Sequence, residues 1–171
     1  WAAAAAAVGC ARLAAARLDP DWGTPLFLVS IGISAAIFAA SFLIAGYFYD
    51  LSYDGQAYHQ EAVIFLAEGW NPVYDPPLEV PTGHALWINH YAKAMEYSAA
   101  AFYKATGLLE HGKLFNLLMI GSSFLLSFAA LLAFSPDKRR SACVIALLLA
   151  LNPVSVYQAL TYYVDGLLAS F

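Results

Sequence analysis

The chain has 171 residues, of which 61% are hydrophobic and only 12% are charged, and its formal net charge is −4. Soluble domains carry about 25% charged residues, so this composition excludes an ordinary soluble domain. The acidic balance also argues against a nucleic-acid partner, because phosphate binding needs clustered lysine and arginine. We therefore expect an integral membrane protein made of helices.

Three apolar stretches predict membrane spans. Residues 26–49 and residues 114–134 contain no charge, and each reaches the roughly 20 residues that cross about 30 Å of hydrocarbon as a helix. The third stretch begins at Ala142 and is interrupted by Asn152 and Pro153, so it is either one kinked helix or a span followed by a turn. The expected segments are an N-terminal segment 1–23, a first span 24–49, a long loop 50–113, a second span 114–134, a short loop 135–141, and a third span with the start of a fourth in 142–171.

The basic residues predict the orientation of these spans. Arg12 and Arg17 precede the first span, and residues 138–140 are three consecutive cations after the second. Lysine and arginine favour the cytoplasmic side, so the loop 50–113 is expected outside. Both cysteines, Cys10 and Cys143, are then on or near the cytoplasmic side, and no disulfide is expected. Because the chain begins at Trp1 and stops within an apolar run, we expect the natural protein to be longer.

The long outer loop has the pattern of two surface helices. One amphipathic stretch, 56–68, ends at Gly69, and a second, about 89–106, ends at Gly107. Between them, residues 70–83 contain four prolines, which forbid regular helix. The predicted fold is an all-α, multi-span helical bundle whose long extracytoplasmic first loop carries two amphipathic interfacial helices.

This order of elements resembles a known enzyme superfamily. An apolar span, then Asp54, an amphipathic helix, a proline-broken stretch, a second amphipathic helix and a second span are similar to the N-terminal module of GT-C glycosyltransferases. These include protein O-mannosyltransferases and aminoarabinose transferases of lipid A. The likeness covers about residues 24–171, and the segments Tyr53–His59 and Glu68–Pro72 also resemble bacterial members.

The resemblance implies a function and a location. It implies an inverting enzyme that moves a sugar from a polyprenyl-phosphate donor to a lipid, glycan or protein acceptor. The enzyme would be a multi-pass protein of a bacterial inner (plasma) membrane, in contact with membrane lipids, with its active loop outside. Some members use a divalent ion such as Mg or Mn and others do not, and no other cofactor is expected.

Such a transfer needs a carboxylate that takes the proton from the acceptor hydroxyl. Asp54 is the candidate base, because it matches the acid that the superfamily carries just after the first span, and Gly55 beside it allows close approach of a ligand. Asp50 is the alternative, one helical turn nearer the membrane. A structural role also stays open, because aspartate is a favoured N-cap.

Five other residues are predicted to bind substrate: His59, Glu61, His90, Lys93 and Asp165. The first two follow Asp54 on the same expected helix. His90 and Lys93 have the i, i+3 spacing of one helix face and suit a phosphate. Asp165 is the only acid in or at the edge of an apolar run, and it is expected on the side of Asp54. The alternative for each is a solvated or interfacial position.

The sequence does not specify a metal site, since the histidines lack zinc-type spacing. Two other classes stay open. A transporter or channel fragment would explain the spans and Asp165. A non-catalytic membrane subunit would explain the aromatic surface helices.

Overall fold

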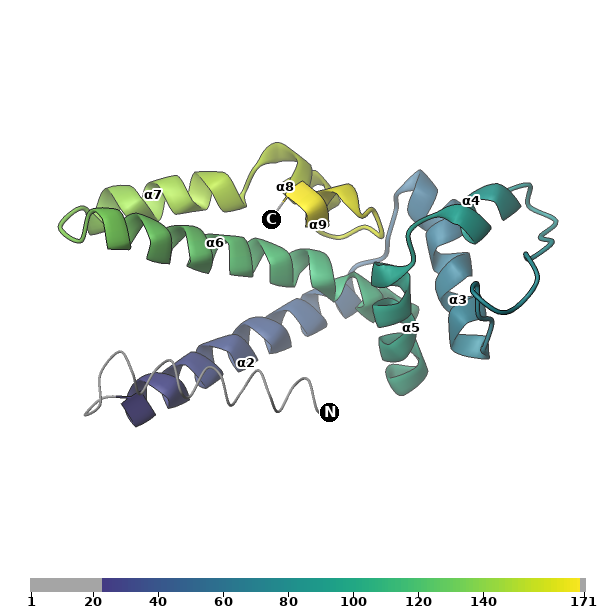
Figure 1. Cartoon of the computed structure of the whole chain (residues 1–171), viewed down its shortest axis with the longest axis horizontal. Helices are drawn as coiled ribbons and strands as arrows, with labels where there is room; N and C mark the ends of the chain where they lie inside the picture. The colour runs from purple at the N-terminus through teal and green to yellow at the C-terminus, as the bar shows by residue number, and fades with distance from the viewer. Residues whose placement is uncertain (1–22, 170–171) are drawn as a thin grey trace. The chain divides into compact units, whose positions relative to one another are not determined.

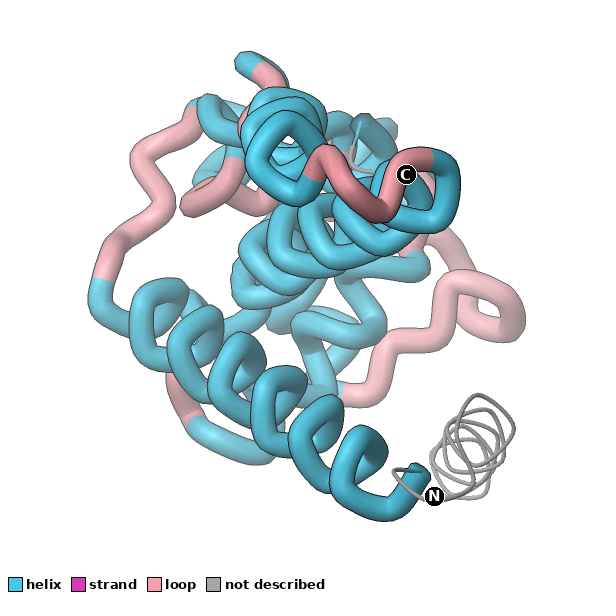
Figure 2. Tube along the Cα trace, turned by 90° about the vertical axis from the view of Figure 1, so that its left-hand side faces the viewer, coloured by secondary structure: helices cyan, strands magenta, loops and turns pink. Residues whose placement is uncertain are grey.

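The computed structural model describes residues 23–169, and their regular elements are all helices, with no strand among them (Figures 1 and 2). The predicted N-terminal segment lies outside these described residues except for Gly23, and so do Cys10, Arg12 and Arg17. The chain divides into two compact units, residues 1–39 and residues 40–171. The first helix, α2 (Gly23–Tyr47), begins in the first unit and ends in the second.

Two of the described helical segments are long and apolar enough to cross a membrane. They are Phe27–Tyr47, with 21 residues, and Leu109–Phe134, with 26 residues. In the most apolar part of the first segment, only 6% of the residues are buried, and in that of the second segment none are. The core helix of a soluble protein would be mostly buried, so these exposed apolar surfaces fit lipid better than water.

The second of these segments packs against the helix that follows it. Helices α6 (Leu114–Phe134) and α7 (Arg139–Ala150) run antiparallel, side by side, joined by a tight turn (Figure 1). The buried residues of α7 are Ala142, Ala146 and Ala150, spaced by four. This spacing forms one face of small side chains, which allows the two backbones to approach.

The structure decides between the two alternatives for the third apolar stretch, one kinked helix or a helix followed by a turn. Helix α7 has 12 residues, which reach about 18 Å at ~1.5 Å per residue, less than a bilayer core. Asn152 starts a separate helix, α8 (Pro153–Gln158), by accepting a 3.0 Å hydrogen bond from the backbone N–H of Ser155. A short helix, α9 (Asp165–Ala169), follows after a turn. The chain therefore turns at Asn152 and Pro153, and no continuous kinked helix forms.

The loop 50–113 contains five short helices instead of two. The π-helical turn η1 (Gly55–His59) and α3 (Gln60–Glu68) together form the first predicted helix, which Gly69 ends at φ 111°. The second predicted helix is wrong at its start, because α4 (Ala85–His90) and α5 (Ala94–Thr106) are separate. The 3-10 helix η2 (Leu109–Lys113) then leads into α6. The proline-containing stretch 70–83 is non-helical, as predicted.

A buried network around Asp50 joins segments that are far apart in the sequence. The Asp50 carboxylate, only 1% exposed, accepts hydrogen bonds from the backbone N–H of Ser52 at 2.8 Å and of Tyr162 at 2.7 Å. The backbone N–H of Asp50 donates to Glu110 at 3.0 Å. The fully buried Lys113 forms an ion pair with Glu110 and donates to the carbonyl of Phe48. These partners compensate for charges whose burial would otherwise be costly.

We predict that Gly55→Ala destabilises the fold. An added Cβ at Gly55 would overlap the Asp50 carboxylate, whose position is fixed by its hydrogen bonds. The expected loss is about 1–3 kcal/mol in the free energy of unfolding, the usual cost of overpacking. The change would be measured as a lower midpoint of thermal unfolding in detergent solution.

The matched control for this substitution is Gly32→Ala. An added Cβ at Gly32, in α2, meets nothing within 4 Å, and alanine is a better helix former than glycine. The control should therefore unfold at the same temperature or higher. Equal midpoints for Gly55→Ala and the unchanged protein would contradict the close packing of Gly55 on Asp50.

Candidate functional site

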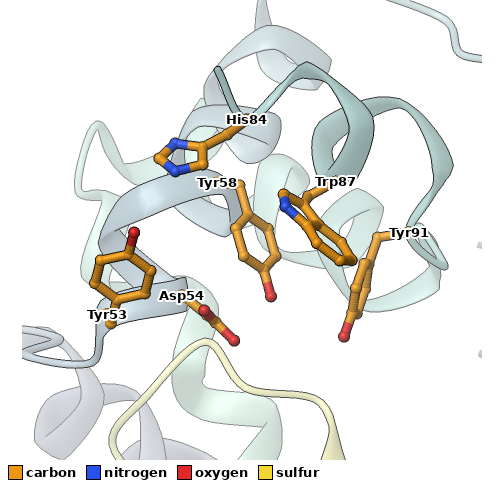
Figure 3. Close-up of a pocket in the computed structure, with 6 residues that line it drawn as sticks. All are labelled: Tyr53, Asp54, Tyr58, His84, Trp87 and Tyr91. Carbon is orange, nitrogen blue, oxygen red and sulfur yellow. The ribbon is translucent and has the colours of Figure 1, made fainter. Parts of the chain in front are cut away.

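A pocket of about 270 Å³ opens beside η1 and α4 (Figure 3). Two of its lining residues, Tyr53 and Asp54, directly precede η1, and Tyr58 lies within it. The remaining three come from α4 and the residues next to it: His84, Trp87 and Tyr91. The pocket thus places Asp54, the candidate base predicted from the sequence, next to a wall of aromatic side chains formed by Tyr58, Trp87 and Tyr91.

Asp54 is positioned by backbone structure, and its carboxylate interacts with the Tyr58 side chain in the pocket. The Oγ of Ser52 accepts a 3.2 Å hydrogen bond from the N–H of Gly55, and the carbonyl of Asp50 accepts one of 2.8 Å from the Gln56 side chain. Asp54 is half-buried and makes no side-chain capping hydrogen bond, although it stands at the N-cap position of η1. This geometry therefore does not support a purely structural N-cap role for Asp54.

Polar oxygens gather at one side of the pocket. The carboxylate of Asp54 and the hydroxyl groups of Tyr58 and Tyr91 point to the same side, whereas the hydroxyl of Tyr53 points toward His84 (Figure 3). Burial, and then the neighbouring Asp54 carboxylate, raise the pKa of Tyr58 well above its ordinary value. Tyr58 is therefore a neutral phenol at physiological pH and can donate a hydrogen bond.

The aromatic wall is held by contacts between its own rings. The ring of Tyr58 lies 5.5 Å from that of Tyr91 and 6.1 Å from that of Trp87, while Trp87 and Tyr91 meet edge to face at 6.1 Å. These centroid distances are within the 4.5–7 Å range of favourable aromatic pairs. The wall can therefore present flat apolar surfaces next to the carboxylate without rearrangement.

A group of buried ionic side chains packs against this aromatic wall. His59 Nδ1 lies 2.9 Å from Glu96 Oε1, and Lys93 Nζ lies 2.8 Å from Glu96 Oε2 as an ion pair without hydrogen-bond alignment. His59 and Glu96 are each 1% exposed. The His59 ring meets Tyr91 edge to face at 5.4 Å. His59 thus connects η1 to α5, whereas Lys93 pairs with Glu96 at the start of α5, and neither residue lines the pocket.

The other predicted site residues lie away from the pocket. Asp50 belongs to the buried network described above, and Glu61 is half-buried and accepts a 3.4 Å hydrogen bond from Thr82. Asp165 is exposed and accepts from the Gln158 side chain at 3.3 Å. His90 is exposed, and the expectation that it shares a helix face with Lys93 is wrong, because α4 ends at His90 and α5 begins at Ala94.

The aromatic members of the pocket were missed as site residues. Tyr91 falls in the predicted surface helix 89–106, and Trp87 lies just before it. A local signal existed for two pairs, since Asp54 and Tyr58, and Trp87 and Tyr91, are each four residues apart, the spacing of neighbours on one helix face. Nothing local indicated that η1 and α4 would meet.

The residues 23–169 contain no group of three or more His, Cys, Asp or Glu side chains placed to hold a metal ion. Of these four residue types, the pocket lining contains one acid, Asp54, and one histidine, His84. The donor set around the pocket is therefore smaller than the six oxygen ligands that Mg²⁺ prefers, unless waters and substrate oxygens complete it.

The fold and the pocket define a class of protein. Its described part is all-helical, has two helical segments of membrane-spanning length, and carries an acidic, aromatic pocket on the stretch that joins them. No protein-family model, curated protein or solved structure matches the chain.

The raised pKa of Tyr58 predicts how stability depends on pH. As the pH rises through the ordinary tyrosine value of about 10, the unfolded chain releases its phenolic proton while the folded chain retains it. The folded state therefore loses stability in the alkaline range. Tyr58→Phe should make the fall in the unfolding midpoint between pH 9 and pH 11 less steep than in the unchanged protein. Equal slopes would show that Tyr58 is not held neutral by the fold.

Proposed function

We propose that this chain belongs to a membrane-embedded, inverting glycosyltransferase of the GT-C kind. The enzyme would move a sugar from a polyprenyl-phosphate donor to a lipid, glycan or protein acceptor at the extracytoplasmic face of a bacterial inner membrane. The observation that carries the proposal is the half-buried carboxylate of Asp54 in a pocket walled by aromatic rings, seven residues after an apolar helix of spanning length ends at Tyr47.

The distribution of charge supports this orientation. The pocket belongs to the stretch that leads into α6, and the cations Lys138, Arg139 and Arg140 follow the opposite end of that helix. If positive residues remain in the cytoplasm, the pocket faces the outer side. Eight acidic residues and three lysines in 50–113 agree with an outer location.

The pocket has the groups that a sugar transfer requires. In the reaction, Asp54 takes the proton of the acceptor hydroxyl as its oxygen bonds to the anomeric carbon of the sugar. The bond from that carbon to the phosphate oxygen breaks with inversion, and polyprenyl phosphate leaves as the anion. The flat aromatic wall suits the apolar face of a sugar ring, and the neutral Tyr58 hydroxyl suits its hydroxyl groups.

The departing phosphate needs a donor or a positive charge. His84 is the lining residue whose imidazole can donate a hydrogen bond to phosphate, and its Nδ1 has no hydrogen-bond partner among the residues described. The predicted phosphate ligand Lys93 is instead paired with Glu96, and His90 does not line the pocket. A divalent ion would have to rely on Asp54 and on oxygens of the donor phosphate.

The proposal predicts that Asp54→Asn lowers transfer from a polyprenyl-phosphate sugar donor by about 10²–10⁴-fold, because a positioned general base contributes that much. The rate would be measured with the full-length protein in proteoliposomes. Glu68→Gln is the matched control, since it neutralises an exposed acid at the end of α3, and should leave the rate unchanged. Unchanged transfer by folded Asp54→Asn would remove Asp54 from the mechanism. Donor binding without transfer by the unchanged protein would favour a non-catalytic subunit.

Asp50→Asn separates the two candidate aspartates. An amide at this position would set an N–H donor against the backbone N–H of Ser52 or Tyr162, so the folded state should lose about 2–3 kcal/mol. Transfer per folded molecule should stay within a few-fold of the unchanged protein. A full loss of transfer at an unchanged unfolding midpoint would instead identify Asp50 as the base.

A further inference from the structure

The turn between α6 and α7 concentrates positive charge at one end of an apolar helix pair. Lys138, Arg139 and Arg140 are consecutive and exposed, and only Asp137 opposes them within the turn. None of the three cations takes part in an ion pair among the residues 23–169. Elsewhere in this part of the chain, Lys93 and Lys113 are paired with carboxylates. The turn and the start of α7 therefore hold three cations against one acid, in a chain with few charges.

The surface of this turn is hollowed as well as charged. A shallow pocket of about 410 Å³ is lined by residues 137–141, which include all three cations. Lys138 also lines a second hollow, of about 120 Å³, with apolar residues such as Leu131 and Ile145. Arg139 also lines a third, of about 350 Å³, with Phe128 and Leu132. The charged hollow thus shares Lys138 with one apolar hollow and Arg139 with the other.

The neighbouring helix surfaces are strongly apolar and uncovered. Phe134, at the end of α6 next to the turn, is 87% exposed, and Leu126 and Leu148 are 72% and 70% exposed. Exposed apolar side chains of this size that meet a cluster of cations resemble the boundary between hydrocarbon and headgroups. A ligand that fits both surfaces has an anionic head and apolar chains.

We propose that this turn binds the headgroup of an anionic glycerophospholipid. The phosphate would contact Lys138, Arg139 and Arg140, and the acyl chains would run along the apolar hollows beside Phe128 and Leu131. The free N–H groups in the first turn of α7 add a partial positive charge at the same place. The proposal rests on the membrane insertion that is part of the proposed function, and it does not depend on sugar transfer.

The test is lipid binding by the full-length protein in detergent micelles, measured by native mass spectrometry. The probes are phosphatidylglycerol and phosphatidylcholine with identical acyl chains. The unchanged protein should bind phosphatidylglycerol at least about tenfold more tightly, because each cation near an anionic lipid adds to binding. The variant Lys138→Gln/Arg139→Gln/Arg140→Gln should bind both lipids equally. Micelles remove any effect of these cations on membrane orientation.

Two controls accompany the glutamine variant. The charge-conserving variant Lys138→Arg/Arg139→Lys/Arg140→Lys should keep the preference, and Lys104→Gln, which removes an exposed cation elsewhere, should keep it too. If the triple glutamine variant does not fold, as judged by circular dichroism, the single variants Lys138→Gln, Arg139→Gln and Arg140→Gln should each reduce the preference in part.

Three results would overturn the proposal. They are equal binding of the two lipids by the unchanged protein, an undiminished preference in the folded glutamine variant, and displacement of phosphatidylglycerol by an equal concentration of inorganic phosphate. The last would indicate a site for a free anion. Because the measurement contains no sugar donor, loss of transfer in the Asp54 variants and loss of lipid preference here are separate outcomes.

Discussion

The buried carboxylate of Asp50 is the interaction on which the arrangement of the second unit depends. It receives one hydrogen bond from its own turn, at Ser52, and one from Tyr162, which is 112 positions further along the chain. The Tyr162 hydroxyl in turn donates to the carbonyl of Leu109, one residue before the Glu110 that pairs with Lys113. A buried charge without partners would destabilise the fold. The segments that contain Asp50, Glu110 and Tyr162 therefore depend on one another for their positions.

This network also determines where the candidate base lies. Asp50 and Asp54 are four residues apart, yet one is fully buried and the other lines a pocket. The difference follows from the turn that Asp50, Ser52 and Gly55 form, because that turn fixes the direction in which η1 begins. Tyr58 then meets Trp87 and Tyr91, and His59 reaches Glu96 behind them. The same short segment therefore supplies both the structural anchor and the chemically available acid.

The few charges of the chain fall into distinct environments. In the described residues, Lys113 and Glu110 contribute to the central network, and Lys93 and Glu96 support the aromatic wall. The cations of the turn between α6 and α7 have no such partner among these residues, and they adjoin exposed apolar surface. In an apolar chain an unpaired charge is costly unless it meets water or a ligand. The first two groups thus stabilise the fold, and the third is the one that we propose binds lipid.

The sequence alone determined the features that depend on local composition and spacing. The uncharged runs 26–49 and 114–134 predicted the two long helices, the glycines 69 and 107 predicted helix ends, and the prolines of 70–83 predicted a stretch without helix. Only the tertiary structure decided which acid is buried, that His59 and Lys93 pair with Glu96, and that Trp87 and Tyr91 form a pocket with Asp54. Two aspartates four residues apart have the same chemistry in a sequence. Contacts with residues 96, 110 and 162, which no local pattern encodes, give each side chain its own surroundings.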